Sequence, residues 1–369
     1  MSVSTGDTNR CRTSDNSYWG FPGYFEVVLL RIIENETARM VAGLAGQFHY
    51  IENVTLTYLA TYIGDPSFHV EQSGESIRYF FFEIYCGPLN VNGTNLRPGN
   101  PQFQRNNATL RRALALGINY SQLIYEIYGD HLQLNSGVTG VSRSIPGHNS
   151  SVVQACDYNY SVGIQMARDL MKIYNPIASG WESNYPGANE VNWTTADLLG
   201  RNIDLNRYFG NPINERINQI LASNWALIGI KTHETIREWD TYCLCGLDNP
   251  NPYELDVIYR AWIPETLNPY YIFDRLFNLE SMYSYSRIND SNLTSMIESA
   301  RETTDKSIEL DIYKDIQSYV YDVDRPLNPS SNVHFSIWTN IVYQVHKEEL
   351  KGVHHNILGI LDVWNWYYE

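Results

Sequence analysis

Residues 260–268 carry four side chains whose types suit the binding of a small polar ligand. The stretch 255–262 is rich in β-branched and aromatic residues and predicts a strand. Trp262 would end this strand at the edge where open α/β sheets bind ligands, so its ring could form a stacking wall. Beyond it, Glu265 offers a carboxylate and Asn268 an amide that could hydrogen-bond to a sugar or peptide. Arg260 could offer its guanidinium fork to a ligand carboxylate.

Each of these side chains also has a structural interpretation. Trp262 could be a core tryptophan, and Glu265 could be a solvated loop acid. Asn268 precedes Pro269 and a helical pattern, where an asparagine is a good N-cap. Arg260 could lie on the surface. The residue types alone leave both interpretations open.

The first third of the chain predicts an α/β arrangement. Residues 1–24 are polar and predict a tail or loop, whereas Phe25–Ile33 is a nearly continuous apolar run typical of a strand buried on both faces. Glu36–Leu44 has helical spacing, and Ile77–Tyr85 is a strong strand candidate. Strands alternating with helices in this way favour an α/β lobe.

Residues 107–129 predict two short helices at the start of another lobe. Leu110 and Leu114 recur at helical spacing, while Arg111 and Arg112 fall on the opposite side and predict a solvated basic face. Ser121 is the expected cap of the second helix. The preceding stretch 90–104 is loaded with Gly, Pro and Asn and predicts a linker, so we expect a lobe boundary there.

A compact βαβ unit is predicted further along the chain. Residues 201–209 indicate an alternating strand, 214–227 an amphipathic helix and 230–236 a second strand. A crossover of this length joins parallel strands. At 369 residues the chain exceeds the length at which one core usually stops growing, so two lobes are expected.

Charge and motif content exclude several functional classes. A net charge of −15 argues against a nucleic-acid partner, because no basic tract could neutralise a phosphate backbone. No apolar run is long enough to span a membrane, and the first 20 residues lack the apolar stretch of a signal peptide. Nucleophile-elbow, zinc-protease, P-loop and dinucleotide-binding motifs are absent, so we expect neither an enzyme nor a cofactor or metal.

Two features nonetheless indicate an extracellular protein. Ten N-x-S/T sequons occur, which favours glycosylation, although those at Asn119 and Asn159 lie near expected helix caps. The five cysteines, among them Cys243 and Cys245, allow one disulfide or two, and their pairing stays open.

These segments, in this order, resemble the family 5 extracellular solute-binding proteins, the oligopeptide- and dipeptide-binding components of ABC importers. Residues 27–51 resemble a first-lobe segment of the family, 107–129 the segment that opens its second lobe, and 217–242 a βαβ segment. The resemblance implies an α/β, two-lobed periplasmic-binding-protein-like fold of type II, with most of the first lobe missing. It suggests a polar tail (1–24), a partial first lobe (25–105), a second lobe (106–326) and a return to the first lobe (327–369).

The resemblance also implies roles for the four side chains. Trp262 and Pro269 match the family pattern, and its two acids become Glu265 and Asn268. Glu265 would then stand where peptide binders place the acid that receives the α-ammonium group of the ligand. The implied function is capture of an oligopeptide, or an oligosaccharide, in an interlobe cleft, with closure by hinges at 86–105 and 326–334.

Partners and location follow from the same resemblance. The captured solute would pass to the membrane subunits of an ABC importer, from an extracellular, cell-surface or periplasmic protein tethered by a segment that this chain lacks. Because family members carry further residues ahead of this point, either Met1 is an internal start or a second chain supplies the missing lobe. A glycosylated surface subunit without transport is the alternative, and a secreted glycoside hydrolase is a third interpretation that no specific motif supports.

Overall fold

The computed structural model describes residues 9–12, 27–33, 36–51, 54, 56–86, 90–91, 94–95, 107–128, 139–174, 193, 196–199, 202–238, 241–242, 256–353 and 367–368. The chain divides into two compact units. Unit 1 comprises Met1–Ser76, His131–Gln133 and Ile341–Glu369, and unit 2 comprises Ile77–Asp130 and Leu134–Asn340. The cysteines Cys243 and Cys245 lie outside the described residues.

Unit 1 combines short strands with two helices. Strand β1 (Asn9–Arg12) pairs antiparallel with β2 (Val27–Leu30), and β11 (Leu350–Lys351) pairs antiparallel with β12 (Tyr367–Tyr368). Strand β3 (Tyr50–Ile51) pairs with the end of β10 (His334–Lys347), which places Ile51 opposite Val345. Helices α1 (Glu36–Leu44) and α2 (Leu56–Ile63) complete the unit, and the prediction of a helix over 36–44 is confirmed.

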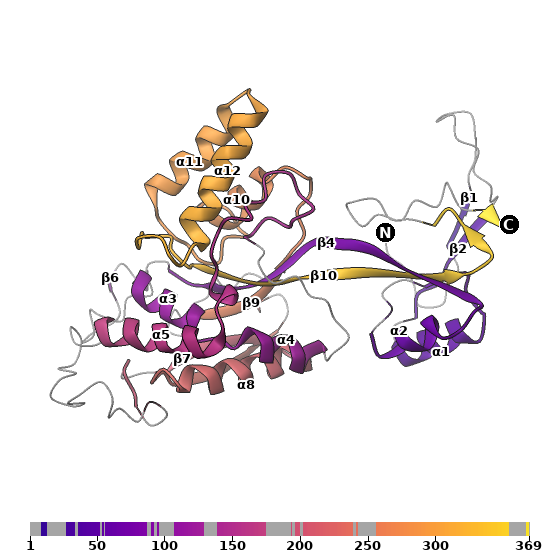
Figure 1. Ribbon diagram of the computed structural model, residues 1–369, viewed down its shortest axis with the longest axis horizontal. Helices are drawn as coiled ribbons and strands as arrows, with labels where there is room; N and C mark the ends of the chain where they lie inside the picture. The colour runs from indigo at the N-terminus through magenta and orange to yellow at the C-terminus, as the bar shows by residue number, and fades with distance from the viewer. Residues whose placement is uncertain are drawn as a thin grey trace. The chain divides into compact units, whose positions relative to one another are not determined.

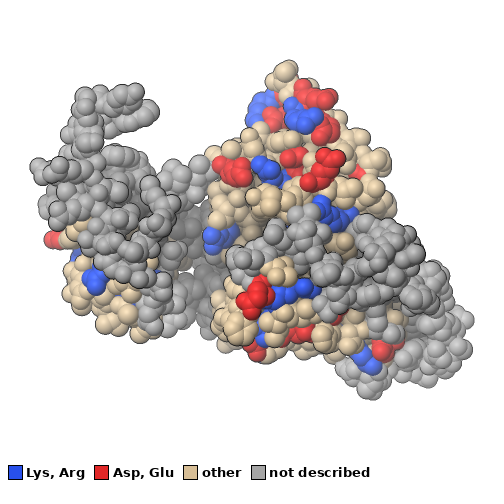
Figure 2. Space-filling view, turned by 180° about the vertical axis from the view of Figure 1, so that it is seen from behind, with Lys and Arg blue, Asp and Glu red and all other residues tan. Residues whose placement is uncertain are grey.

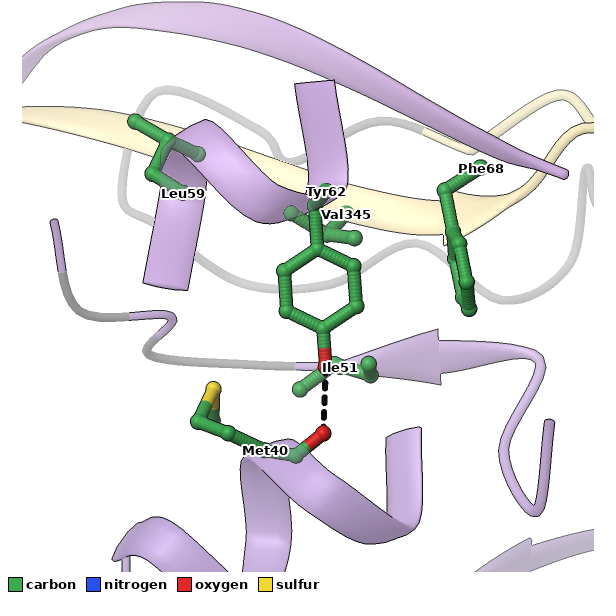
Figure 3. Packing of buried hydrophobic residues seen from close by; sticks show 6 residues of the cluster. All are labelled: Met40, Ile51, Leu59, Tyr62, Phe68 and Val345. Carbon is green, nitrogen blue, oxygen red and sulfur yellow. Dashed lines mark hydrogen bonds between the residues drawn. The ribbon is translucent and has the colours of Figure 1, made fainter. Parts of the chain in front are cut away.

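The core of unit 1 is a small apolar cluster (Figure 3). The hydroxyl of Tyr62 points at α1 and donates a hydrogen bond of 2.8 Å to the carbonyl oxygen of Met40. The Tyr62 ring meets that of Phe68 edge to face at 5.0 Å. A side chain at Gly43 would overlap both Ile51 and Tyr62, so this position requires glycine for the helix to approach the strand. The cluster consists of Met40, Ile51, Leu59, Tyr62, Phe68 and Val345.

Two predictions for the start of the chain are wrong. Residues 9–12, expected to be tail or loop, form a strand. The apolar run 25–33 was expected to be buried on both faces, yet the strand covers only Val27–Leu30, with Leu29 57% exposed and Ile32 70% exposed. The strand pairs in a two-stranded sheet. Burial on both faces is typical of parallel sheets, whose two faces are covered by helices.

Unit 2 is built on a mixed sheet with helices on both faces (Figure 1). The strand order of the whole sheet is β3-β10-β4-β9-β7-β8, in which β3 belongs to unit 1 and the chain passes between the units within β4 (Phe68–Ile84) and within β10. Strand β9 (Val257–Trp262) runs antiparallel to β4 and parallel to β7 (Ile203–Tyr208). Strand β8 (Thr232–Arg237) runs parallel to β7. A separate hairpin is formed by β5 (Asn90–Val91) and β6 (Thr94–Asn95).

The helices of unit 2 cover the two faces in separate groups. Helices α10 (Tyr270–Phe277), α11 (Ser291–Glu302) and α12 (Lys306–Tyr321) lie on one side in Figure 1. The other side carries α3 (Ala108–Leu116), α4 (Tyr120–Tyr128), α5 (Tyr160–Tyr174) and α8 (Pro212–Ala226), and a short 3₁₀ helix spans Ala155–Asp157. The predicted βαβ unit is thereby confirmed as β7, α8 and β8.

Asparagine and aspartate side chains start most of these helices. Asn211 accepts from the amides of Ile213 and Asn214 and is followed by Pro212, whose ring suits the first helical position. Asn119, rather than the expected Ser121, caps α4 by accepting from the amide of Gln122 at 3.1 Å. The helix begins at Tyr120, two residues earlier than a cap at Ser121 would place it.

The arginines of α3 contradict the predicted solvated face. Arg111 is fully buried, with Nε 2.9 Å from the carbonyl oxygen of Ser331 and Nη2 2.6 Å from that of Pro329. Arg112 is 8% exposed and donates to the carbonyl oxygens of Asp322 and Arg325. Both faces of α3 are covered, so the helical pattern could not tell which side faces water.

This packing also bears on two expectations about loops and strands. Residues 326–334, expected to be a hinge, lie inside unit 2 and are held by Arg111 and Arg112, and their role as a hinge stays a prediction. The other expected hinge, 86–105, falls largely outside the described residues and stays a prediction, as does the lobe boundary there. Strand β7 is buried from Ile203 to Arg207 rather than alternating, as a central strand covered on both faces should be.

Candidate functional site

The end of strand β9 positions the site. In the antiparallel register with β4, Trp262 lies opposite Tyr79, and Arg260 lies opposite Phe81. Side chains two residues apart on a strand project from the same face, so Arg260 and Trp262 share one face with the β4 residues opposite them. Glu83 of β4 belongs to the same face, because it lies opposite Ile258.

Trp262 and Tyr283 form an aromatic wall at the end of this strand. Their rings meet edge to face, with centroids 5.2 Å apart. The indole Nε1 of Trp262 is buried and has no hydrogen-bond partner among the residues that the structure describes. The guanidinium of Arg275 lies 5.8 Å above the Tyr283 ring, within the range of a cation–π contact.

One carboxylate stands beside this wall. Glu265 is 57% exposed, and its Oε2 lies 3.9 Å from Nη2 of Arg275, which is itself 38% exposed. An ion pair this long and this exposed is weak, so the carboxylate can exchange partners. Exposed apolar side chains adjoin the wall in sequence: Ile263 at 46% and Met282 at 51%.

Arg260 makes its hydrogen bonds within the protein. Its Nη1 donates to Oε2 of Glu83 at 2.9 Å and to the carbonyl oxygen of Tyr283 at 2.8 Å, and its side chain is 13% exposed. The fork expected for a ligand carboxylate is therefore engaged within the protein. Arg260 supports the wall from behind.

Glu83 is the buried partner of that arginine. Its Oε1 accepts from the amide of Ser286 at 2.8 Å and lies 3.1 Å from Nε2 of His334, and both side chains are fully buried. Burial alone would raise the pKa of Glu83, but the neighbouring His334 and Arg260 and the Ser286 amide hold it below its ordinary value. The group is thus a carboxylate inside the fold.

Asn268 has a structural role in this arrangement. Its Oδ1 accepts from the amide of Tyr270 at 2.9 Å, at the start of α10, and its Nδ2 donates to Oε1 of Glu309 at 3.0 Å. Both functional ends of the amide are used in joining α10 to α12. The structure therefore brings Trp262 and Glu265 together around Tyr283 and Arg275, while Arg260 is bonded to Glu83 and Asn268 joins the start of α10 to α12.

Sequence reasoning missed Tyr283, Arg275, Glu83 and His334. A signal existed for Glu83, because it is the acid within the apolar run Ile77–Tyr85, and a buried acid requires a partner. Nothing in the local sequence indicates that the partners are Arg260, 177 residues away, and Ser286, 203 residues away.

Opposite charges alternate elsewhere on unit 2. Figure 2 shows acidic and basic side chains interleaved over the part that holds α11 and α12. Three ion pairs lie on these helices: Arg301 with Glu298, Lys306 with Glu309, and Lys314 with Asp311. Within the described ranges, no three His, Cys, Asp or Glu side chains gather as a metal site would require, and no helix is both long and apolar enough to cross a membrane.

Comparison with known proteins decides the family. The profile of the bacterial extracellular solute-binding proteins, family 5 (middle region), matches residues 2–284. The chain belongs to this family. Members of family 5 are binding proteins rather than enzymes, and the family is extracellular.

Individual relatives are distant. The family 5 chain is 20% identical to the heme-binding protein A of Haemophilus influenzae over 308 residues, which cover 83% of the chain and 48% of that protein. It is also 20% identical to the dipeptide-binding protein of Escherichia coli over 314 residues, covering 83% of the chain and 50% of the relative. The chain thus spans about half the length of these curated relatives.

Solved structures confirm the fold. HbpA2 from Haemophilus parasuis aligns with a TM-score of 0.73 at 15% identity, covering 100% of the chain and 63% of that structure. The periplasmic binding protein DppA from Helicobacter pylori, in complex with the peptide STSA, aligns with a TM-score of 0.66 at 16% identity, covering 96% and 59%. The predicted α/β fold of type II periplasmic binding proteins is therefore correct.

Proposed function

We propose that this family 5 chain captures peptides at the β9 end of unit 2, with Trp262 and Tyr283 as the apolar wall and Glu265 as the acceptor of a ligand ammonium group. The observation that carries the proposal is the exposed carboxylate of Glu265 beside that wall, held only by a 3.9 Å contact to Arg275. An ammonium group could replace this weak partner and form a charge-assisted hydrogen bond.

Peptides fit the chemistry of the wall better than small ions do. Aromatic rings, together with the exposed Ile263 and Met282, offer apolar contact for a side chain next to the ammonium group. An oligosaccharide would stack on the same rings but has no use for the carboxylate as an ion-pair partner. Members of the family with dipeptide-binding and heme-binding names supply precedents for organic ligands of this size.

The test compares peptides that differ in one charge. Binding of tripeptides to hexapeptides with a free amino terminus is measured by calorimetry on this chain, against the same peptides with an acetylated amino terminus. Glu265→Gln should weaken the free-amine peptides by about 10- to 100-fold, the value of one hydrogen bond to a charged group, and leave the acetylated ones unchanged.

A matched control is Asp169→Asn, which neutralises a 56% exposed acid on α5, across the sheet from the site. It should leave the affinity of all peptides unchanged. Equal weakening by both substitutions would show a general charge effect. Failure of every peptide to bind the unsubstituted chain would reject peptide capture at this site.

Because the chain belongs to family 5, the proposal includes delivery of the peptide to the membrane subunits of an ABC importer. It also includes a tether outside this chain. A second chain that completes the first lobe is a further component. It predicts that the chain and a polypeptide supplying the remaining family segments co-purify as one complex, and separate elution of the two would reject it.

The sequons favour one alternative, a glycosylated surface subunit. Asn289 and Asn292 are exposed at the start of α11 and could carry glycans. Asn149 could not do so without rearrangement, because its Nδ2 donates to the carbonyl oxygen of Lys314 and to the hydroxyl of Ser318. A mass decrease after N-glycosidase treatment of the natural protein would support glycosylation, and an unchanged mass would reject it.

A further inference from the structure

We propose that Glu83 is the positioning residue of the aromatic wall: through Arg260 it sets where Tyr283 stands against Trp262. This inference rests on the proposed function for its meaning, since the wall is the surface proposed to meet the ligand. Glu83 itself touches no ligand. Its carboxylate is fully buried and joins segments that are far apart in sequence.

One nitrogen of Arg260 links the carboxylate of Glu83 to the backbone of the wall. Nη1 of Arg260 carries two hydrogens, and the structure gives it two acceptors: Oε2 of Glu83 at 2.9 Å and the carbonyl oxygen of Tyr283 at 2.8 Å. The carboxylate therefore orients the guanidinium so that its second N–H meets the backbone of the wall. Without that anion the guanidinium would lose the charged partner that directs this nitrogen toward Tyr283.

Glu83 also holds the segment that carries Tyr283 at a second point, Ser286. Ser286 donates its amide to Oε1 of Glu83 at 2.8 Å, so the same carboxylate holds residue 283 through Arg260 and residue 286 directly. A loop held at both ends has few alternative conformations. The Tyr283 ring is thereby kept 5.2 Å from that of Trp262.

The residues packed around the Glu83 carboxylate fix its orientation. His334 lies between the rings of Phe81, at 4.7 Å, and Phe277, at 4.3 Å, with Nε2 3.1 Å from Oε1 of Glu83. The histidine cannot swing away without opening that stack. Strand β10 and helix α10 thus hold Glu83 in one orientation. Through Arg260, this orientation fixes the position of the wall that is proposed to meet the ligand.

The consequence is that Glu83 should control the conformation of Trp262 even when no ligand is present. A residue that only stabilised the fold would change the unfolding midpoint and leave the folded environment of Trp262 as it was. The two roles differ in a spectroscopic signal that needs no ligand.

The experiment uses the full chain labelled with 5-fluorotryptophan, and the ¹⁹F resonance of Trp262 is assigned by its loss in Trp262→Phe. In Glu83→Gln this resonance should shift or broaden, while that of Trp225, buried and bonded to Leu114, should not move. Affinity for a free-amine tripeptide should fall about tenfold, equivalent to about 1.4 kcal/mol.

A double variant separates positioning from stability. Glu83→Leu with Arg260→Met replaces the buried ion pair by apolar side chains, which commonly restores stability. We expect the unfolding midpoint to recover only in part, because the Ser286 amide and His334 lose their acceptor, while the Trp262 resonance and the affinity stay altered. This variant also carries the test if Glu83→Gln does not fold.

Two results would overturn the proposal: an unmoved Trp262 resonance in folded Glu83→Gln, or recovery of both resonance and affinity in the double variant. If the unsubstituted chain binds no peptide, the proposed function fails, whereas the ligand-free resonance still decides the role of Glu83. The two failures are therefore distinguishable.

Discussion

Replacing Arg111 by methionine tests the interior of unit 2, because two interpretations of this residue give opposite outcomes. The helical pattern places it on a solvated face, where a substitution changes the free energy of unfolding by no more than about 0.5 kcal/mol. The structure buries it completely, with hydrogen bonds to the carbonyl oxygens of Ser331 and Pro329.

The magnitude follows from those two bonds. Each is a hydrogen bond from a charged donor, worth about 1.5–3 kcal/mol, and each loss leaves a buried carbonyl oxygen without a partner. Against this, methionine removes the cost of keeping a guanidinium out of water, which is several kcal/mol in general terms. We expect Arg111→Met to destabilise unit 2 by about 3 kcal/mol.

The assay is urea unfolding followed by tryptophan fluorescence, together with hydrogen exchange of residues 329–333. Exchange there should become faster in Arg111→Met, because the carbonyl oxygens of this segment lose their donors. Lys231→Met, at a 51% exposed lysine paired with Asp197, is the control and should change little. A loss below about 0.5 kcal/mol at Arg111 would refute the buried arrangement.

Three further outcomes are expected. Asn268→Ala should cost about 1 kcal/mol through loss of its hydrogen bonds to the Tyr270 amide and to Glu309, and calorimetry should show unchanged peptide affinity. Trp225→Phe removes the 2.9 Å bond from its indole N–H to Leu114 and should lower the free energy of unfolding by about 1–3 kcal/mol in the same urea assay. Because the pKa of Glu83 is lower in the folded chain than in the unfolded one, stability should be lost as pH falls below about 4.3, and Glu83→Gln should flatten that slope in an acid titration.

The secondary structure of unit 2 could be predicted because its local signals agree with its packing. Asn211 and Pro212 mark the start of α8, and its apolar face gives the inward residues Ile217, Ile220 and Leu221. The parallel pairing of β7 and β8 then follows from the length of the crossover. In this unit the cap residues, the apolar face of the helix and the strand pairing all favour the same structure.

The apolar run at 25–33 shows where that agreement ends. Hydrophobicity describes what a strand could bury, and not whether other elements cover it. Leu29 is 57% exposed and Ile32 is 70% exposed, although the run that contains them is as apolar as a buried strand. A local pattern holds no information on whether other elements cover the strand.

The site divides in the same way. The places of Trp262 at a strand end and of Glu265 in the following loop could be predicted because they are local features, and the ligand-binding roles of both residues stay predictions. The supporting shell could not, because Glu83, Arg260, Ser286 and His334 meet only through the register of β4 with β9 and the packing of α10. A charged residue in an apolar run indicates that a partner is needed, but the topology of the fold determines which residue that partner is.

The same distinction applies to the buried carboxylate of Glu83. If Glu83 served stability alone, an apolar pair of similar volume would serve as well, because buried ion pairs contribute little net free energy. What an apolar pair cannot supply is direction, since only the guanidinium donates to the carboxylate and to Tyr283 from one nitrogen. The arrangement is therefore better explained by the orientation of the wall than by the stability of the fold.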